Sequence, residues 1–489
     1  MIKLNLFGRG LRLQIAITIA CQMAFILFGY DQGVFGGLVG NPDWKNTFGN
    51  PGSGLEGIIV SIYNLGAFSG CIITFLFGEK LGRRLCIETS TVPMYQSELC
   101  DADKRGRLVS SEPLFVGVGI VISYFLQVLP TSISVLDRDY GMSYVGGPVS
   151  WRVPIACQVI FAFVVIFLVF GLPESPRWLY YHGRKEEALQ VMCDVWDSEP
   201  DGEKVTKMQT EILEAIELER VHGEYKWRDL LKRDNVQTGR RVLLAYGMQF
   251  MNQMGGINLV VYYVPTALQY NVVFFFGSLI PTFFLDKMGR RRPMMWGSFG
   301  LAISMMLIAV LLSFTVQRGY SPATKQATSS ASVAFFFTYM FIFGATANCI
   351  PWVYVPEILP QHARAKGTAV GISSNWLWNF VVVMITPTLL SHLAWKGYLI
   401  FMCTNLAFVP LVYFCYPETS NLTLEEVDHL FTTGGKHGFK EVAKMQPAEP
   451  VQQSLHVPHD DEKMVGGVGR EGSREHVETL DEGKDDKSV

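Results

Sequence analysis

Charged residues are scarce in this sequence. Of its 489 residues only 17% are Asp, Glu, Lys or Arg, whereas 49% are hydrophobic. Soluble domains carry charge on about a quarter of their residues, so the composition favours a membrane protein. The formal net charge is −3 and no dense basic tract occurs, which gives no indication of a nucleic-acid partner.

Motifs for catalysis and for metal binding are also lacking. The sequence contains neither a nucleophile–base pair nor a phosphate-binding loop, so we do not expect an enzyme. Its nine cysteines are scattered, mostly within apolar runs, without CxxC spacing. We interpret them as small packing residues, and we expect no metal and no cofactor.

The chain is instead rich in long apolar runs. A bilayer core is about 30 Å thick, and a helix needs roughly 20 apolar residues to cross it. Nine runs approach or exceed this length: 12–38, 57–77, 113–135, 153–172, 242–266, 294–315, 331–355, 367–390 and 397–416. A tenth run, residues 272–285, would reach only about 21 Å at 1.5 Å per residue. We therefore predict an all-α membrane protein with ten membrane helices, the last of them doubtful in length.

Basic residues indicate the orientation. Clusters such as Arg83-Arg84, Arg240-Arg241 and Arg290-Arg291-Arg292 fall on one side if the N-terminus is cytoplasmic. The positive-inside rule then places both termini in the cytoplasm, and we expect the plasma membrane as location. Four segments follow: membrane units at 1–172 and 242–416, a cytoplasmic helical linker at 173–241, and a polar tail at 417–489 expected to be disordered.

The linker shows helical periodicity. Its stretches Lys185–Val195 and Gln209–Arg220 repeat apolar residues three and four positions apart, as amphipathic helices do. We predict that both lie on the cytoplasmic face of the membrane.

The chain also repeats a set of motifs, which is a fold-level signal. The first copy reads Gly82-Arg83-Arg84, Tyr95-x-x-Glu98, Arg105 and Pro173-Glu174-Ser175. The second copy reads Gly289-Arg290-Arg291, Tyr354-x-x-Glu357, Arg364 and Pro417-Glu418-Thr419. The step from Glu to Arg is seven positions in both copies.

Together with further motifs, this set resembles the sugar porter family of the major facilitator superfamily, most closely its fungal hexose transporters. The further motifs are Gly29-Tyr30-Asp31-Gln32-Gly33, Pro173-Glu174-Ser175-Pro176-Arg177-Trp178, Gln253-x-x-Gly256-Ile257-Asn258, Pro351-Trp352 and Asn375-Trp376. The resemblance covers residues 12–430 and implies the major facilitator fold. That fold has twelve helices in two bundles around a central sugar site.

The repeated charges predict a cytoplasmic latch. Arg and Glu side chains at helix ends can pair across neighbouring helices and favour one conformation. The alternative is that they only anchor the helices at the headgroup level. The predicted latch residues are Arg83, Arg84, Glu98, Arg105, Glu174, Arg290, Arg291, Glu357, Arg364 and Glu418.

Amides within an apolar run predict a substrate site, because polar groups at membrane depth are expensive and normally line a cavity. Gln249, Asn252 and Gln253 share one helix face, and Asn258 joins them only if Gly255-Gly256 interrupts the helix. Paired donors and acceptors suit the vicinal hydroxyls of a sugar. The alternative is that these amides bond neighbouring helices together.

The resemblance extends this site. It implies sugar contacts at Gln249, Gln253, Asn258, Trp352 and Asn375, and an outer gate at Tyr262 and Tyr263. Trp376 is a further candidate for the cavity wall. A sugar-binding Gln common in the fifth helix of the family is replaced by Pro113.

Asp31 is the candidate for proton coupling. A buried carboxyl group should be either protonated or paired. By resemblance it matches the proton carrier of sugar symporters, whose partner is an Arg on the fourth helix. The alternative is an acid near the outer interface with no role in transport.

The first copy of the repeat is short. Arg84 and Tyr95 are eleven positions apart, whereas Arg291 and Tyr354 are sixty-three apart. The difference, less a loop, is about forty residues or two membrane spans. We infer that the third helix, most of the fourth and part of the eighth are missing, and that residues 127–139 are additional. The partner Arg is lost with the fourth helix.

The sequence thus predicts a hexose carrier working by alternating access with a proton, in a lipid bilayer, impaired by the missing helices. The alternative is a non-transporting sugar sensor or an inactive, dominant-negative isoform.

Overall fold

The structure is a computed structural model. It describes residues 7–38, 41–84, 92–100, 102–128, 149–222, 234, 236–263, 267–317, 319–360, 363–420, 422, 427 and 430–431. The described residues belong to one compact unit, residues 1–443, and their regular structure is helical.

Helices of the first part of the chain precede the linker. They are α1 (Leu11–Leu38), α2 (Pro42–Thr47), α3 (Ser53–Leu81), α4 (Val92–Leu99), α5 (Ala102–Val128) and α6 (Val149–Gly171). The linker helices are α7 (Pro176–Tyr181), α8 (Lys185–Trp196) and α9 (Glu203–His222).

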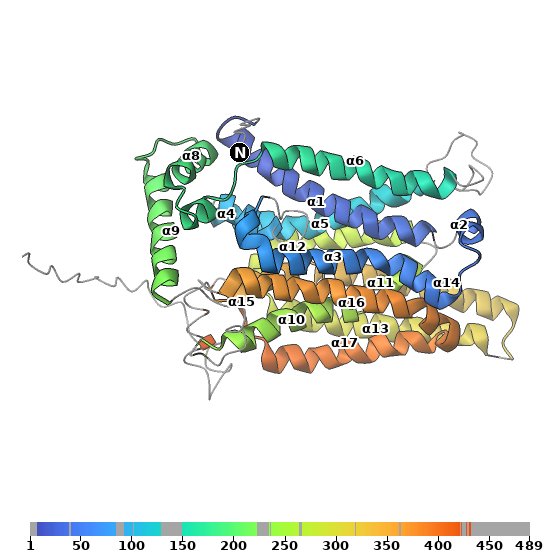
Figure 1. The fold of residues 1–489 in the computed structure, drawn as a ribbon. Helices are drawn as coiled ribbons and strands as arrows, with labels where there is room; N and C mark the ends of the chain where they lie inside the picture. The colour runs from blue at the N-terminus through green and yellow to red at the C-terminus, as the bar shows by residue number, and fades with distance from the viewer. Residues whose placement is uncertain are drawn as a thin grey trace, which may run out of the picture. The chain divides into compact units, whose positions relative to one another are not determined.

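Helices of the second part follow. They are α10 (Thr238–Met254), α11 (Ile257–Tyr263), α12 (Ala267–Met288), α13 (Arg291–Val316), α14 (Pro322–Ala345), α15 (Ile350–Ile358), α16 (Arg364–Leu393) and α17 (Lys396–Cys415). The long helices run side by side, and α8 and α9 lie at the end where α1 begins (Figure 1).

The protein is a multi-pass membrane protein. Within the described ranges, eight segments are long and apolar enough to cross a bilayer: Leu11–Gly36, Ser53–Gly78, Leu108–Leu126, Val149–Gly171, Arg291–Val316, Pro322–Ile358, Lys366–Leu393 and Lys396–Cys415. The predicted run 242–266 corresponds to the pair α10–α11.

Two sequence-based boundaries were wrong. The doubtful tenth helix, α12, has 22 residues and reaches about 33 Å, because residues before and after the apolar run also join the helix. The run 113–135 corresponds to α5, which begins at Ala102 and ends at Val128. Polar residues at its start continue the helix, so a search for apolar residues alone places it too late.

Both predicted amphipathic helices of the linker are confirmed as α8 and α9. α8 is attached to the start of α1 by the backbone hydrogen bond from Gly10 N to Asp194 O (2.7 Å). The side chains of Arg9 and Asp194 form an ion pair at 2.7 Å. The linker is therefore held against the first membrane helix.

The two copies of the repeat differ in the described structure. Between α3 and α5 only α4 is described, and residues 85–91 and 101 lie outside the description. Between α12 and α16 lie the long helices α13 and α14 and the short α15. The predicted junction at residues 85–90 and most of the segment 127–139 also lie outside the described residues.

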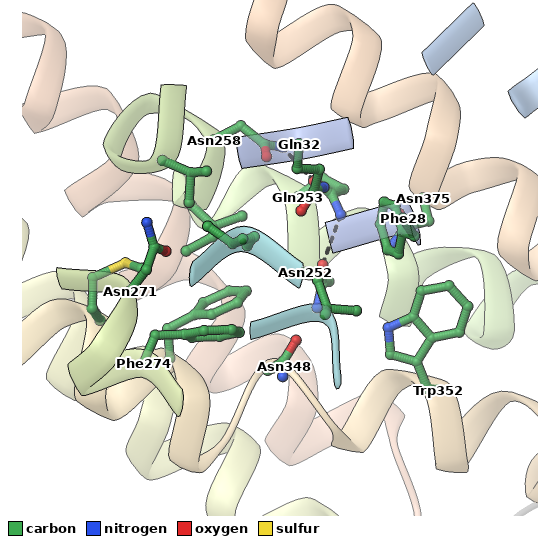
Figure 2. A pocket seen from close by; sticks show the side chains of 16 residues that line it. Phe28, Gln32, Asn252, Gln253, Asn258, Asn271, Phe274, Asn348, Trp352 and Asn375 are labelled. Atoms are coloured by element: carbon green, nitrogen blue, oxygen red, sulfur yellow. Dashed lines mark hydrogen bonds between the residues drawn. The ribbon is translucent and has the colours of Figure 1, made fainter. Parts of the chain in front are cut away.

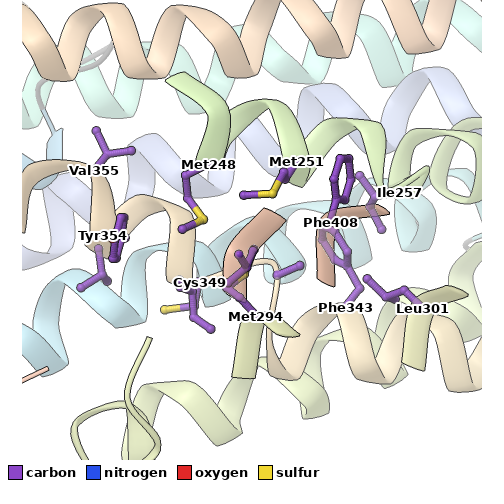
Figure 3. Packing of buried hydrophobic residues seen from close by; sticks show 14 of the residues in the cluster. Met248, Met251, Ile257, Met294, Leu301, Phe343, Cys349, Tyr354, Val355 and Phe408 are labelled. Atoms are coloured by element: carbon purple, nitrogen blue, oxygen red, sulfur yellow. The ribbon is translucent and has the colours of Figure 1, made fainter. Parts of the chain in front are cut away.

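Packing joins helices that are distant in sequence. α1 packs along α5, α5 along α12, and α3 along α16. The largest apolar cluster centres on the second part of the chain, where Met248, Met251 and Phe408 pack together with residues of α14 and α15 (Figure 3). Outward-facing residues such as Ile62, Phe163 and Phe167 are more than half exposed, as lipid-facing side chains are.

Candidate functional site

The site is built around two interrupted helices. α10 ends at Met254 and α11 begins at Ile257, and between them Gly256 has φ +96°, which a residue with a Cβ rarely adopts. This interruption at Gly255-Gly256 meets the condition for Asn258 to join the site. The carbonyl oxygen of Gly255 accepts hydrogen bonds from Tyr339 Oη and Asn405 Nδ2, both at 2.9 Å.

The second interruption lies between α14, which ends at Ala345, and α15, which begins at Ile350. Pro351 has no N–H and cannot bond the carbonyl four residues earlier, that of Ala347. Instead, Ala347 O accepts a 2.6 Å hydrogen bond from Asn252 Nδ2 of α10. One side chain thus connects the two interruptions.

Amide side chains form a chain of hydrogen bonds from this point (Figure 2). Asn258 Nδ2 donates to Gln253 Oε1 at 2.6 Å, and Gln253 Nε2 donates to Asn252 Oδ1 at 2.8 Å. All three residues are buried. Each orients the next, so Asn252 and Gln253 of the predicted trio are held in a fixed geometry with Asn258, whereas the third member, Gln249, is not part of this chain.

A second amide pair is incompletely bonded. Asn375 Nδ2 of α16 donates to Gln249 Oε1 of α10 at 2.7 Å. Both side chains are buried, and neither Gln249 Nε2 nor Asn375 Oδ1 has a partner among the described residues. A buried donor without a partner costs about 1–3 kcal/mol, so the pair offers one donor and one acceptor to a polar ligand.

Asn375 and the bonded amides of Asn252, Gln253 and Asn258 border a cavity of about 40 Å³, which is room for a few water molecules. Of the predicted residues, Asn252, Gln253, Asn258, Trp352 and Asn375 line it.

The first part of the chain also contributes to the wall. The residues involved are Phe28, Gln32, Val116 and Ile120. The cavity therefore lies between α1 and α5 on one side and the interrupted helices on the other.

Two predicted residues stand outside this lining. Gln249 contacts the cavity only through Asn375. Trp376 packs against Phe28 with ring centroids 4.8 Å apart, and Phe28 lines the cavity.

Three polar lining residues were missed by the sequence analysis, namely Gln32, Asn271 and Asn348. Each stands within or beside an apolar run. The cost of polar groups at membrane depth was therefore a signal that could have identified them.

Asp31 precedes Gln32 in α1 but is not one of the lining residues. Its Oδ1 is buried and has no hydrogen-bond partner in the described structure. Tyr262 and Tyr263 end α11, and the placement of their side chains lies outside the description.

The second copy of the charged motif forms a closed network. Arg290 donates to Glu357 through Nη2 (2.9 Å) and Nε (3.2 Å), and Thr419 Oγ1 donates to Glu357 Oε2 (2.7 Å). Glu418 accepts the backbone N–H groups of Arg290 (2.8 Å) and Arg291 (3.0 Å). The residues that follow the C-terminal end of α12 are thereby joined to the loop after α17, and both are joined to α15.

The first copy repeats this geometry. Glu174 accepts the backbone N–H groups of Arg83 (2.8 Å) and Arg84 (3.1 Å), and Ser175 donates to Glu98 as Thr419 does to Glu357. Burial raises the pKa of Glu174, and these backbone donors oppose the shift.

Glycine is required at the start of both motifs. Gly82 and Gly289 have φ +88° and +76°, and a Cβ on either would meet the adjoining Glu carboxylate. The repeat read from the sequence is therefore a structural repeat.

Each network connects helices of one half of the chain. Arg364 begins α16, and the side chain of Arg105 in α5 lies outside the description.

Known proteins are similar to this chain in sequence and in fold. The family described as "Sugar (and other) transporter" matches residues 16–92 and 87–431, so the chain belongs to this family. Its homologues are transporters of the major facilitator superfamily, and the protein is not an enzyme. The two matched segments overlap at residues 87–92, between Arg84 and Tyr95, where the first copy of the repeat is short.

Three similar proteins illustrate the relationship. The chain is 34% identical to the MFS-type transporter oryC of Aspergillus oryzae, with 85% of each protein covered. It is 29% identical to the Sugar transporter STL1 of Saccharomyces cerevisiae, covering 88% of this chain and 83% of that protein. The fold is similar to that of the proton:xylose symporter XylE of E. coli, with a TM-score of 0.68 and 21% identity over 86% of this chain and 99% of XylE.

Proposed function

We propose that this transporter carries a monosaccharide, most suitably a hexose, across the membrane by alternating access. The observation that carries the proposal is the buried set of amides at two interrupted helices. An interrupted helix presents backbone and side-chain polar groups at membrane depth, which is where transporters of this superfamily hold their substrates. The family and the Saccharomyces relative, which is named a sugar transporter, support it.

Sugar recognition follows from the unbonded amide atoms. Gln249 Nε2 offers a donor and Asn375 Oδ1 an acceptor, a pair that suits two neighbouring hydroxyls. Gln253, Asn258 and Asn252 supply further amide dipoles, and Trp352 supplies a flat apolar surface for a pyranose ring. Trp376 supports the wall through Phe28.

Alternating access follows from the size of the cavity. A volume of about 40 Å³ holds a few waters but no hexose, so the helices around it must separate for the sugar to enter. We assign the opening to movement of α11 and α15, the short segments after the interruptions. Tyr262 and Tyr263, at the end of α11, would form the outer gate.

The repeated charge networks would form the latch, favouring one conformation at the cytoplasmic ends of the helices. In this proposal Arg83, Arg84, Glu98, Arg105 and Glu174 stabilise the first half. Their counterparts Arg290, Arg291, Glu357, Arg364 and Glu418 stabilise the second half. Each network keeps its own helix ends together while the halves move relative to one another.

Proton coupling is assigned to Asp31. Its buried, unpartnered carboxyl oxygen favours the protonated form until the site opens to water.

The predicted membrane units 1–172 and 242–416, the cytoplasmic linker 173–241 and tail 417–489 remain part of the proposal. So do the cytoplasmic termini, the plasma-membrane location and the inference that the third helix, most of the fourth and part of the eighth are missing. The relatives are named transporters, so a sensor or an inactive isoform is not favoured.

The test is uptake of labelled glucose by a host that lacks its own hexose carriers. Saturable uptake that a protonophore abolishes supports a proton-coupled carrier. Binding without uptake by protein shown to reach the cell surface would instead indicate a receptor.

A further inference from the structure

Glu112 is an acid at membrane depth to which nothing above assigns a role. It lies in α5, within the apolar segment Leu108–Leu126, and its side chain is fully buried. Neither of its carboxyl oxygens has a hydrogen-bond partner in the described structure. A carboxylate buried in this way without a cation or donor is strongly disfavoured, so the group is neutral while its surroundings stay dry.

The surroundings of Glu112 are the second interrupted helix. Asn348 Nδ2 donates to Pro113 O at 3.3 Å, and Cys349 Sγ donates to Ser110 O at 3.5 Å. The turn between α14 and α15 therefore contacts α5 on both sides of Glu112. If α15 moves when the carrier opens, these two contacts break and water gains access to the acid.

Glu112 is also adjacent to the substrate cavity. Val116, one helical turn further along α5, lines the cavity, as does Asn348. A change at the sugar site that displaces Asn348 is thus transmitted to the contact beside Glu112.

Among the described side chains, few other charges face this acid. The Glu112 carboxyl group interacts electrostatically with Cys21 of α1 and Cys349. Arg290 and Glu357 also interact electrostatically with Cys349. These two side chains are hydrogen-bonded to each other and not to Glu112.

Other titratable groups lie on the helices packed against α5. Among the described side chains they are Arg12, Tyr30 and Asp31 of α1, Tyr95 and Glu98 of α4, Arg152 and Cys157 of α6, Lys287 of α12, and Tyr354 and Glu357 of α15. None of them is hydrogen-bonded to Glu112, so we take water entering at the α14–α15 turn as the partner with which its proton exchanges.

We propose that Glu112 is a proton-binding site of the transport cycle, protonated while the α14–α15 turn contacts α5 and deprotonated when that turn withdraws. The proton passes between the carboxyl group and water, with no other bond changed. This proposal rests on the proposed sugar transport. It adds a second acid to Asp31 and places it where the turn at the substrate cavity controls access.

The test uses the full chain in proteoliposomes and compares wild type with Glu112→Gln and Glu112→Asp. Glucose counterflow requires no net proton movement, so Glu112→Gln should retain it. Uptake driven by an inward proton gradient should be lost in Glu112→Gln and restored in Glu112→Asp. Gradient-driven uptake equal to wild type in Glu112→Gln would overturn the proposal.

Infrared titration separates this proposal from the proposed function. In the Asp31→Asn background, a carboxylic-acid C=O stretching band that titrates with pH should be present and should disappear when Glu112→Gln is added. If wild type shows no counterflow but the band behaves as described, the sugar assignment fails and the proton site stands. A missing band, or one unchanged by Glu112→Gln, contradicts the proton site whatever the transport result. The Asp31→Asn protein by itself can lack the band. The proposal can therefore be contradicted even if the variant with Glu112→Gln added does not fold.

Discussion

The side-chain amide of Asn252 donates a 2.6 Å hydrogen bond to the main-chain carbonyl of Ala347, and this bond connects the two interrupted helices of the site. Because Pro351 has no N–H, that carbonyl lacks its partner within the helix, and the Asn252 amide donates to it instead. A hydrogen bond that one helix cannot make within itself is thus supplied by another helix. The site and the packing of the membrane core are therefore parts of one structure.

Replacing this amide should destabilise the protein. In Asn252→Leu, Ala347 O and Gln253 Nε2 lose their partners, and each buried orphan costs roughly 1–3 kcal/mol. We expect a lower midpoint of thermal unfolding in detergent and no sugar binding. Ser391→Ala, which removes an exposed hydroxyl bonded within α16, is the control and should unfold as wild type does. Equal midpoints for both variants would refute the connecting role.

Sugar affinity should depend on Gln249. Gln249→Leu removes the unbonded donor, and loss of one hydrogen bond of about 1.4 kcal/mol weakens binding roughly tenfold. Gln96→Leu is a matched control, because Gln96 of α4 is also buried with an unpartnered amide, whereas only Gln249 is bonded to a cavity-lining residue, Asn375. Dissociation constants for glucose, measured calorimetrically, should change only in Gln249→Leu. Similar values for the two variants would remove Gln249 from the site.

The ion pair of the second half should control conformation. Arg290 is 5% exposed in its side chain, so Glu357→Gln leaves a buried guanidinium without its counter-charge, at a cost of roughly 3 kcal/mol. We expect altered exchange kinetics and greater alkylation of cytoplasmic-side cysteine probes. Glu187→Gln breaks the partly exposed pair with Arg184 and should cost less than about 1 kcal/mol. Unchanged exchange and unchanged labelling in Glu357→Gln would exclude the latch.

Coupling should depend on Asp31. Asp31→Asn keeps the shape of the side chain but removes the titrating proton, so protonophore-sensitive accumulation should disappear while counterflow remains. The control is Asp201→Asn. Asp201 is exposed in the turn before α9, so this variant should leave both activities intact. Accumulation by Asp31→Asn at the wild-type level would assign coupling to another group.

The first interruption could be predicted from the sequence because its cause is local. Two successive glycines at 255 and 256 weaken the helix at the position where it breaks. The second interruption could not, because its cause, Pro351, stands four residues after the carbonyl that it releases. Only the neighbouring helix shows that Asn252 satisfies that carbonyl.

The side chains of the site also divide into those that the sequence could predict and those that it could not. The amides of α10 share a face by spacing alone, so their grouping was predictable. Glu112 was not identified, because the apolar run was taken to begin at Pro113, and burial of the acid depends on the packing of α5 against α1 and the α14–α15 turn. Asn348 and Asn271 likewise acquire their role only through tertiary packing.

The measurement that tests the account most directly is counterflow of labelled glucose into proteoliposomes preloaded with unlabelled glucose, with no proton gradient. We expect transient accumulation of label in wild type, strongly reduced in a Gln249→Leu, Asn375→Leu double variant that is still folded. Absence of counterflow in folded wild-type protein, or equal counterflow in the double variant, would contradict sugar transport at this site.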